Sequence, residues 1–339
     1  MSQLAVVILN FNGKEFIKKF LPVVIQNSTV AEIVVADNAS TDGSVELMKA
    51  EFPDIRLLVL EENSGFAGGY NRALAQVDAE YYVLLNSDIE VTKDWLLPLL
   101  DLMNSDKSIA ACQPKILSYH QKEYFEYAGG SGGFIDKLGY PFCRGRVFEQ
   151  LEKDDGQYDD AREVFWATGA CLFVRASTYH SLGGLDEDFF AHMEEIDFCW
   201  RAKNAAYKVY VQPSSVIYHV GGGTLPRNSS QKTYLNFRNN FALLFKNLPK
   251  NRLWKVLVVR LFLDGLAGTR FLFQGNFGDM LAVIKAHFYF YFHLQSLKAK
   301  RNQLKQKPVS MIYQKSLVSN HYLKGKKYFS QFDSADFSN

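Results

Sequence analysis

The chain has 339 residues, of which 47% are hydrophobic and 22% charged, a composition that excludes an intrinsically disordered protein. This length allows one large domain with an appendage or two modest domains. The net charge of +2 is unevenly distributed: residues 1–240 carry 22 basic and 32 acidic side chains, whereas residues 241–330 carry 16 basic and 2 acidic ones. An acidic front and a basic back predict two regions with different partners. Because no recognised nucleic-acid-binding module accompanies the basic region, we expect no nucleic-acid partner.

Two features bear on the cellular compartment. The first twelve residues contain a strand-length apolar run but no basic segment and no small-residue cleavage site, so we expect no signal peptide. The cysteines are widely spaced and form no CxxC pair, which favours reduced core thiols over a zinc site or a disulfide framework. They are Cys112, Cys143, Cys171 and Cys199. We therefore expect a cytoplasmic protein.

In the first half of the chain, short apolar runs alternate with helical patterns. The apolar runs cover residues 4–9, 33–36, 57–60 and 81–85. The segments between them have apolar residues at spacings of three and four, as amphipathic helices do. These segments are 14–27, 43–52 and 67–77. Continuous apolar strands separated by such helices predict an α/β fold with a mostly parallel central sheet and helices on both faces.

Polar residues follow each apolar run. In a parallel sheet, ligands bind beyond the C-terminal ends of the strands, so these positions are candidates for a binding site. Any one of them alone is equally well explained as a turn or a helix cap, but their shared edge favours a nucleotide site. They are Asn10 and Asn12 after the first run, Asp37 after the second, Asn63 after the third, and Asn86, Ser87 and Asp88 after the fourth.

Asp88 is the strongest of these candidates. An acid that closes a buried strand offers an oxygen ligand to Mg²⁺ or Mn²⁺, which proteins hold with one or two carboxylates plus substrate phosphates. Such a cation stabilises the charge that develops on a departing diphosphate. Asp37 is positioned to accept hydrogen bonds from a base or a ribose. The segment 63–74, which contains Gly68 and Asn71, permits close backbone approach and leads into a helix whose N-terminus favours anions.

A second candidate region spans residues 184–211. On a helix, Glu194, Asp197 and Arg201 share one face, and Glu195 lies beside it. Repulsion among the acids raises the pKa of at least one of them, which suits a carboxylate that accepts a proton during catalysis. The alternative is structural, because acids at a helix start also interact favourably with the macrodipole.

Two single residues each have two interpretations. His219 follows another strand and precedes three glycines, so it is either a structural histidine or a ligand for the metal or a phosphate. Trp166 either stacks on a sugar face or belongs to the core.

Together these motifs resemble one known family. Seven segments occur in the order and approximate spacing of family 2 glycosyltransferases: VVILNFNG, VVADNASTDGS, ENSGFAGGYNRAL, LLNSDIEV, GACLFVR, GGLDEDFFAHMEEIDFCWR and YHVGGGT. They most resemble the bacterial rhamnosyltransferase-like branch, which builds cell-surface polysaccharide. The resemblance covers residues 3–245. It implies a GT-A fold, which is a Rossmann-like nucleotide-binding domain, together with an inverting mechanism and a divalent cation, Mg²⁺ or Mn²⁺.

The resemblance also implies individual roles. Asp37 corresponds to a nucleoside-binding aspartate. Asp88 corresponds to the metal-binding aspartate that ends a DxD motif, whose first position here is Asn86. The acid pair that contains the catalytic base falls on Glu194 and Glu195, so Glu195 occupies the base position, although which acid takes the proton stays open. The predicted catalytic residues are Glu195, Glu194 and Asp197.

The implied reaction transfers a sugar from a UDP- or dTDP-sugar, with dTDP-rhamnose favoured by the resemblance, to an acceptor hydroxyl on a saccharide or a lipid-linked saccharide. It would serve the synthesis of cell-surface polysaccharide or glycolipid. A sugar nucleotidyltransferase is one alternative, but it is expected to have a Gly-rich basic loop after the first strand, where this chain has NFNGKEF. A catalytically inactive sugar-nucleotide-binding or membrane-surface assembly protein is another, which the acids at 88, 194, 195 and 197 disfavour.

The pattern changes in residues 231–330, which are apolar, aromatic and basic. We expect a helical extension without a membrane-spanning helix, since charges interrupt every long apolar run. Amphipathic helices of this composition suit an anionic membrane surface, on the inner face of the cytoplasmic membrane; the alternative is packing on the catalytic domain or a homodimer interface. The chain is thus divided into a catalytic domain at 1–230, with a donor half at about 1–115 and an acceptor half at about 116–230, the extension, and a tail at 331–339.

Overall fold

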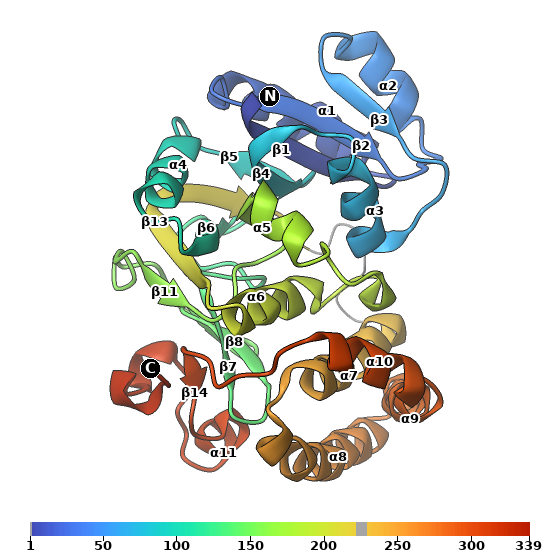
Figure 1. The fold of residues 1–339 in the computed structure, drawn as a ribbon, viewed down its shortest axis with the longest axis vertical. Coiled ribbons are helices and arrows are strands. Elements are labelled where there is room, and N and C mark those ends of the chain that lie inside the picture. The colour runs from blue at the N-terminus through green and yellow to red at the C-terminus, as the bar shows by residue number, and fades with distance from the viewer. Residues whose placement is uncertain (1, 222–228) are drawn as a thin grey trace.

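The computed structural model describes residues 2–221 and 229–339, in which an α/β region is followed by a group of helices (Figure 1). The predicted apolar runs lie in four strands, which the predicted helices connect. The strands are β1 (Ser2–Asn10), β2 (Glu32–Asp37), β3 (Arg56–Val59) and β4 (Ala79–Asn86), and the helices are α1 (Lys14–Asn27), α2 (Ser44–Glu51) and α3 (Gly65–Leu74). The alternation of strand and helix predicted from the sequence is confirmed.

Five more strands belong to the same central sheet in the described part of the chain. They are β5 (Ile89–Val91), β6 (Ile109–Ser118), β11 (Arg162–Val164), β12 (Cys171–Arg175) and β13 (Lys208–His219). The order is β11–β13–β6–β12–β4–β1–β2–β3, with β5 paired to β13. Strands β5, β11 and β12 run against the other six, so the sheet is mostly parallel, as predicted. Asn10 pairs in register with Asp37, and Leu9 with Asn86, so the polar ends of β1, β2 and β4 meet at one edge.

Both faces of this sheet are buried, which explains why its strands appear in the sequence as continuous apolar runs. Side chains alternate along a strand, so Leu4, Val6 and Ile8 enter a core with α1, α2 and α4. Ala5 and Val7 face the opposite core, with α3, α5 and α6. The additional helices are α4 (Leu96–Ser105), α5 (Ala176–Ser181) and α6 (Glu194–Asn204). Each fully buried Leu, Val or Ile side chain contributes about 1.5–3 kcal/mol, so these two layers hold the strand ends rigidly in place.

All four cysteines are buried and free, as expected of core thiols. Burial raises the pKa of Cys112 and Cys171 above that of an exposed thiol, which disfavours the reactive thiolate.

A smaller sheet lies beside the central one and includes the end of the chain. Its order is β10–β9–β8–β7–β14, and β14 pairs with β7 in parallel. The strands are β7 (Gly133–Asp136), β8 (Pro141–Cys143), β9 (Arg146–Val147), β10 (Gln150–Leu151) and β14 (Ile312–Tyr313). Phe329, Phe332 and Phe337 surround Phe142, with ring centroids 5.7–6.3 Å apart. The helical pattern predicted as far as residue 330 therefore ends earlier, because these aromatic rings bury themselves against the smaller sheet.

In the sequence, the predicted helical extension lies between β13 and β14. It consists of α7 (Ser230–Asn247), α8 (Lys250–Phe273), α9 (Phe277–Phe292) and α10 (Leu294–Gln303). Helix α7 packs on α9 through Phe241 and Phe245, whose rings lie 4.7 and 5.3 Å from that of Phe290. A short helix, α11 (Leu317–Tyr322), follows β14. In residues 2–221 and 229–339, no helix combines the length and apolarity needed to cross a bilayer.

Candidate active site

A cavity of about 460 Å³ opens at the edge of the central sheet where β1, β2 and β4 end. Its walls come from the loops after these strands, the start of α3, the start of α6, the end of β13 and the first turn of α7. Eight of the residues predicted from the sequence line it: Asn12, Asn63, Asn86, Ser87, Asp88, Glu194, Glu195 and His219. The parallel strands and the later acidic helix therefore converge on one cavity.

A buried polar layer supports the donor-side wall of this cavity. The Asn10 Nδ2 atom donates to Asp37 Oδ2 at 2.9 Å, and Asp37 Oδ1 accepts from the Ser40 backbone N–H at 2.8 Å. Asn10 Oδ1 is buried and has no hydrogen-bond partner. Asp37 itself is only 1% exposed, so it shapes the loops rather than the cavity surface.

Asn38 also lines the cavity, and it was not singled out from the sequence. Its Nδ2 atom donates to Asn63 Oδ1 and to the Gly65 carbonyl, both at 3.0 Å. It thereby connects the loop after β2 to the start of α3. The only sequence signal for it was its place in the polar run after the second strand.

The metal candidates form an ionic group with a third residue that the sequence did not indicate. The His219 ring lies between two carboxylates, with Nε2 3.2 Å from Asp88 Oδ1 and Nδ1 3.2 Å from Glu126 Oε2. Burial disfavours a charge on His219, but the two carboxylates outweigh it and raise its pKa to about 10. Burial likewise opposes ionisation of Asp88 and Glu126, yet the charge of His219 holds the pKa of both below the usual values.

The residues at this position fit a divalent cation only together with a donor's phosphates. Asp88 is one carboxylate on the cavity wall, and the described residues contain no group of three or more His, Cys, Asp or Glu side chains that could hold a metal. One carboxylate plus substrate phosphate oxygens is the usual arrangement for Mg²⁺. The predicted ligand role of His219 would require loss of its proton, because an imidazolium ring has no free lone pair.

Glu194 and Glu195 also line the cavity, and they lie in the first turn of α6. The Oε2 atoms of both residues are buried and have no hydrogen-bond partner. Burial raises the pKa of Glu195 to about 7. Burial, followed by the charge of Glu195, raises the pKa of Glu194 well above its usual value. A carboxylate whose pKa lies near neutral pH is well matched to accepting a proton from a hydroxyl group.

Comparison with known proteins agrees with this arrangement. Residues 5–159 match the family model described as glycosyl transferase family 2. The chain is 28% identical over 247 residues to the low-salt glycan biosynthesis hexosyltransferase Agl10 of Haloferax volcanii, covering 71% of this chain and 75% of that protein. It is 27% identical over 238 residues to the N-acetylglucosaminyl-diphospho-decaprenol L-rhamnosyltransferase of Mycobacterium tuberculosis, covering 65% of this chain and 77% of that protein.

The chain thus contains a domain of the glycosyl transferase family 2 type, matched over residues 5–159. Its fold is the GT-A fold that was expected. The crystal structure of GalNAc-T7 with UDP, GalNAc and Mn²⁺ superposes with a TM-score of 0.55 at 15% sequence identity, covering 74% of this chain and 49% of that one. The prediction of an enzyme of this family, made from the seven segments, is confirmed.

In this transferase the turn that precedes the acidic pair is strained. Phe190, His192 and Met193 all have positive φ angles, of 62°, 70° and 74°. Non-glycine residues adopt this left-handed conformation at a cost and retain it only where the surrounding structure holds it. Met193 immediately precedes α6, so the turn sets the direction in which the carboxylates of Glu194 and Glu195 enter the cavity.

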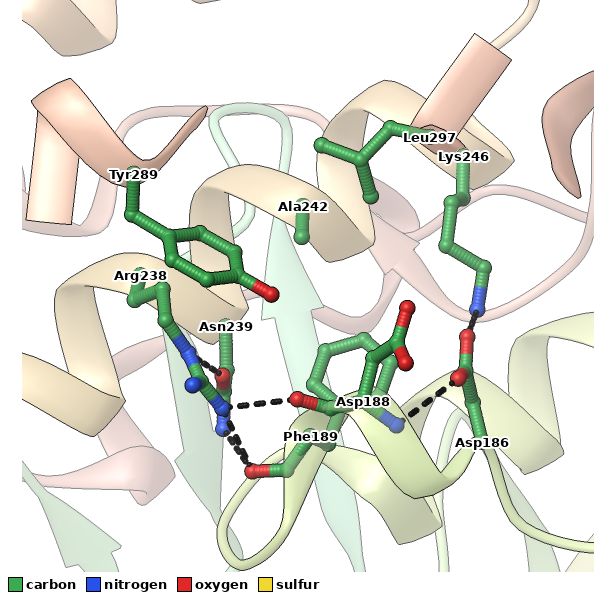
Figure 2. A pocket seen from close by; sticks show the side chains of 9 residues that line it. All are labelled: Asp186, Asp188, Phe189, Arg238, Asn239, Ala242, Lys246, Tyr289 and Leu297. Carbon is green, nitrogen blue, oxygen red and sulfur yellow. Dashed lines mark hydrogen bonds and ion pairs between the residues drawn. The ribbon is translucent and has the colours of Figure 1, made fainter. Parts of the chain in front are cut away.

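Helix α7 holds this turn through two side chains that sequence reasoning missed. The Asn239 amide nitrogen lies within hydrogen-bond distance of three carbonyl oxygens of the turn, those of Phe189, Ala191 and His192, at 2.9, 2.8 and 2.7 Å. Arg238 donates to the carbonyls of Asp188 and Phe189, both at 2.8 Å (Figure 2). The extension therefore supports the turn that leads into this cavity.

A network of ion pairs lies beside these contacts. The Lys246 Nζ atom is 2.5 Å from Asp186 Oδ2 (Figure 2). The same atom is 2.9 Å from Asp197 Oδ1. Lys300 lies 2.5 Å from both Asp186 and Asp188. Burial opposes ionisation of Asp186, but the two lysines lower its pKa. These pairs join α7 and α10 to the segment that precedes α6.

Asp197 is part of this network, which argues against its predicted catalytic role. It is 0% exposed and does not line the cavity. Arg201 Nε donates to it at 2.8 Å, and Asn247 donates at 2.8 Å. Burial opposes its ionisation, but Lys246 and Arg201 keep its pKa low. Three residues from Glu194 along the same helix, this carboxylate faces the interior of the protein.

Besides Asn10 and Asp37, four further candidate residues lie off the cavity lining. Arg201 donates to the Leu182 and Gly184 carbonyls as well as to Asp197. Trp166 is 4% exposed, and its Nε1 donates to the Phe134 carbonyl at 3.0 Å, so its ring belongs to the core. The remaining two are Asn71, which donates to Leu185 O and accepts from Leu185 N and Tyr179 Oη, and Gly68, where an added Cβ would meet Ser64 Cβ at 2.8 Å. These residues pack against or bond to neighbouring loops and do not contact the cavity.

Proposed function

We propose that this glycosyltransferase inverts the configuration of a sugar that it moves from a nucleotide diphosphate to an acceptor hydroxyl. The observation that carries the proposal is the presence, in one cavity, of Asp88 after β4 and of a Glu195 carboxylate with a pKa of about 7, whose Oε2 atom has no hydrogen-bond partner among the described residues. A base and a diphosphate-binding position on the same cavity are what a single displacement needs.

In the proposed step, the carboxylate of Glu195 accepts the proton of the acceptor hydroxyl while the oxygen of that hydroxyl forms a bond to the anomeric carbon. The bond from that carbon to the diphosphate oxygen breaks, and the electron pair leaves with the diphosphate. Attack from the opposite face inverts the centre, through a transition state with oxocarbenium character like that of glycoside hydrolysis. The strained turn at 190–193 directs Glu195 toward the cavity.

A divalent cation, Mg²⁺ or Mn²⁺, would be held by Asp88 and the donor's phosphates, and it would supply charge neutralisation of the leaving diphosphate. His219 is itself a buried cation 3.2 Å from Asp88, so it contributes positive charge on the same side of the cavity. Asn12, Asn38 and Asn63 would contact the nucleoside, over the buried Asn10–Asp37 pair.

The donor and acceptor are proposed from the relatives. The names of the two relatives are those of a hexosyltransferase of glycan biosynthesis and a rhamnosyltransferase that acts on a polyprenyl diphosphate-linked sugar. A UDP- or dTDP-sugar donor, with dTDP-rhamnose the first to test, and a lipid-linked saccharide acceptor follow from them. We therefore propose that the enzyme acts on the cytoplasmic side in the synthesis of cell-surface polysaccharide or glycolipid.

Thermal stabilisation by UDP, dTDP, GDP and CDP, each with and without Mn²⁺, tests the donor half of the proposal. A ligand present at about a hundred times its Kd adds roughly 2.7 kcal/mol to the free energy of unfolding. We expect a metal-dependent shift with one nucleotide, lost in Asp88→Ala. Absence of any shift with all four nucleotides would contradict the proposal, and nucleotide binding without turnover on any donor would favour an inactive binding protein instead.

A further inference from the structure

The α8–α9 hairpin presents a continuous apolar face to solvent. On α8, Trp254, Val258, Phe262 and Leu266 follow one another at four-residue spacing and are 61, 65, 67 and 50% exposed. Residues four apart lie on the same side of a helix, so these four form one stripe. Phe273, at the end of α8, is 89% exposed.

Helix α9 also exposes large apolar side chains. Phe277, Leu281, Ile284, Phe288 and Phe292 recur at spacings of three and four along the helix, and Tyr291 is exposed as well. The two helices pack against each other and lie at the outer edge of the molecule, far from β2 and β3 (Figure 1). We call these exposed apolar residues of α8 and α9 the hairpin face. Soluble proteins rarely expose so many large apolar side chains together unless a membrane or another protein covers them.

The charges along residues 250–298 are mostly positive. The exposed cations of this segment are Lys250, Lys255, Arg270, Lys285 and Lys298. Its two acids are Asp264 and Asp279. Asp264 is 1% exposed and is paired with Arg260 and His287 in the interior, so Asp279 is the one acid of this segment that reaches solvent.

We propose that the hairpin face docks on an anionic lipid membrane surface. Aromatic and aliphatic side chains enter the boundary between headgroups and acyl chains, and the surrounding lysines and arginines attract anionic headgroups. A second copy of the chain fits less well. In a two-fold dimer the same patch meets itself, so five exposed cations would approach five others with one acid on each side to offset them.

The hairpin face is rigidly connected to the active site. Helix α7 contributes Lys232 to the cavity lining at its first turn and Asn239 to the strained turn before Glu194. Further along the same helix, Phe241 and Phe245 pack on Phe290 of α9. One helix of 18 residues, about 27 Å long, therefore joins the two. Docking would hold the cavity near a lipid-linked acceptor. Only this benefit rests on the proposed function.

Tryptophan fluorescence gives a direct measurement in the full chain. Of the four tryptophans, Trp95, Trp166 and Trp200 are at most 4% exposed and Trp254 is 61% exposed, so Trp254 dominates the response to a change in solvent contact. We expect vesicles that contain phosphatidylglycerol to shift the emission to shorter wavelength and to reduce quenching by aqueous acrylamide. The variant Trp254→Phe should lose both responses while still sedimenting with the vesicles.

Charge and apolar variants separate the two contributions. Lys255→Gln and Lys285→Gln should each weaken binding to phosphatidylglycerol vesicles roughly fivefold, and raised salt should weaken it further. Phe262→Glu with Phe288→Glu should weaken it by more than about tenfold. The matched control is Val30→Glu, which adds a charge at a 49% exposed apolar residue outside the extension and should leave binding unchanged.

Three results would overturn the proposal. One is absence of binding to phosphatidylglycerol vesicles at low salt, and another is equal binding to neutral phosphatidylcholine vesicles. The third is a dimer in sedimentation velocity that Phe262→Glu dissociates, which would assign the hairpin face to a second copy. Nucleotide-dependent melting shifts are measured on the same variants and should persist in all of them. Loss of those shifts in the unmodified protein would reject the proposed function without affecting the vesicle result.

Discussion

The cavity brings together two acidic regions with opposite electrostatics. On one side, Asp88 and Glu126 share the protonated ring of His219, so both carboxylates are held in their charged form. Elsewhere on the cavity wall, Glu194 is buried and Glu195 partly buried, and no ion pair to either is found in the described part of the chain, so burial raises the pKa of each. The same residue types are thus tuned in opposite directions by whether a cation lies beside them.

This difference assigns the two regions to different tasks. A carboxylate that stays charged through the neutral pH range suits the binding of a cation beside a diphosphate, as proposed for Asp88. A carboxylate that gains and loses a proton near neutral pH suits proton transfer, as at Glu195. Asp197 shows the same rule within one helix, because Lys246 and Arg201 keep it charged and inert only two residues after Glu195.

The largest expected effect comes from removing the base itself. Glu195→Gln keeps the shape of the side chain but cannot accept a proton, so we expect turnover to fall by about 10²–10⁴-fold. Initial rates with the donor identified by melting shifts measure it. Nucleotide stabilisation should be unchanged, since the donor-side residues are untouched. A variant that keeps more than a tenth of the normal rate would place the base elsewhere.

The next prediction removes one shared cation from two paired carboxylates. Lys246→Met leaves Asp186 with Lys300 and Asp197 with Arg201, so the free energy of unfolding should fall by about 3 kcal/mol, the low end for a broken buried ion pair. Urea denaturation at neutral pH measures it. Lys298→Met, at an exposed position on α10, is the matched control and should change stability by less than about 0.5 kcal/mol. Equal effects in the two variants would contradict the role given to these ion pairs.

The comparison also predicts the pH dependence of the reaction. With a pKa of about 7, Glu195 is protonated at lower pH and cannot act as a base, so kcat should fall about tenfold per pH unit below 7. Burial, not the charge of Glu194, raises the pKa of Glu195. Glu194→Gln should therefore leave the break in the profile near 7. A break near 4.5 in the unmodified protein would mean that a solvated carboxylate is the base.

The sequence predicted the strands, the helices between them and the eight cavity-lining residues because those depend on local patterns. Apolar runs of strand length identify β1 to β4, and a parallel sheet brings their polar ends together whatever the packing details. The acids of α6 were found for the same reason, since helical spacing is a local property. Fold class and the position of the cavity follow from such patterns alone.

The remaining features depend on contacts between distant segments, which no local pattern carries. Glu126 is significant only because His219, 93 positions later, reaches it, and Asn239 only because its amide meets the turn before α6. Asp197 was misassigned for a related reason. On an isolated helix it shares a face with Glu194, but α7 packs on α6 and supplies Lys246 as one of the cations of Asp197.

The smallest expected effect tests whether the buried carboxyl group of Glu194 lowers the stability of the protein. The folded protein binds a proton at Glu194 more tightly than the unfolded chain, whose carboxyl has a pKa near 4.5. Between 4.5 and its raised pKa the folded state holds more protons, so the free energy of unfolding decreases as pH rises through that window. Glu194→Gln carries no charge, so at pH 8 it should be more stable than the unmodified protein by at least about 1 kcal/mol, and the difference should vanish toward pH 4.5. Denaturant melts at both pH values measure it, with Glu61→Gln on an exposed loop as the control. A Glu194→Gln protein that is less stable at pH 8 would mean that Glu194 is charged and paired, and the contrast between the two sides of the cavity would then fail at this residue.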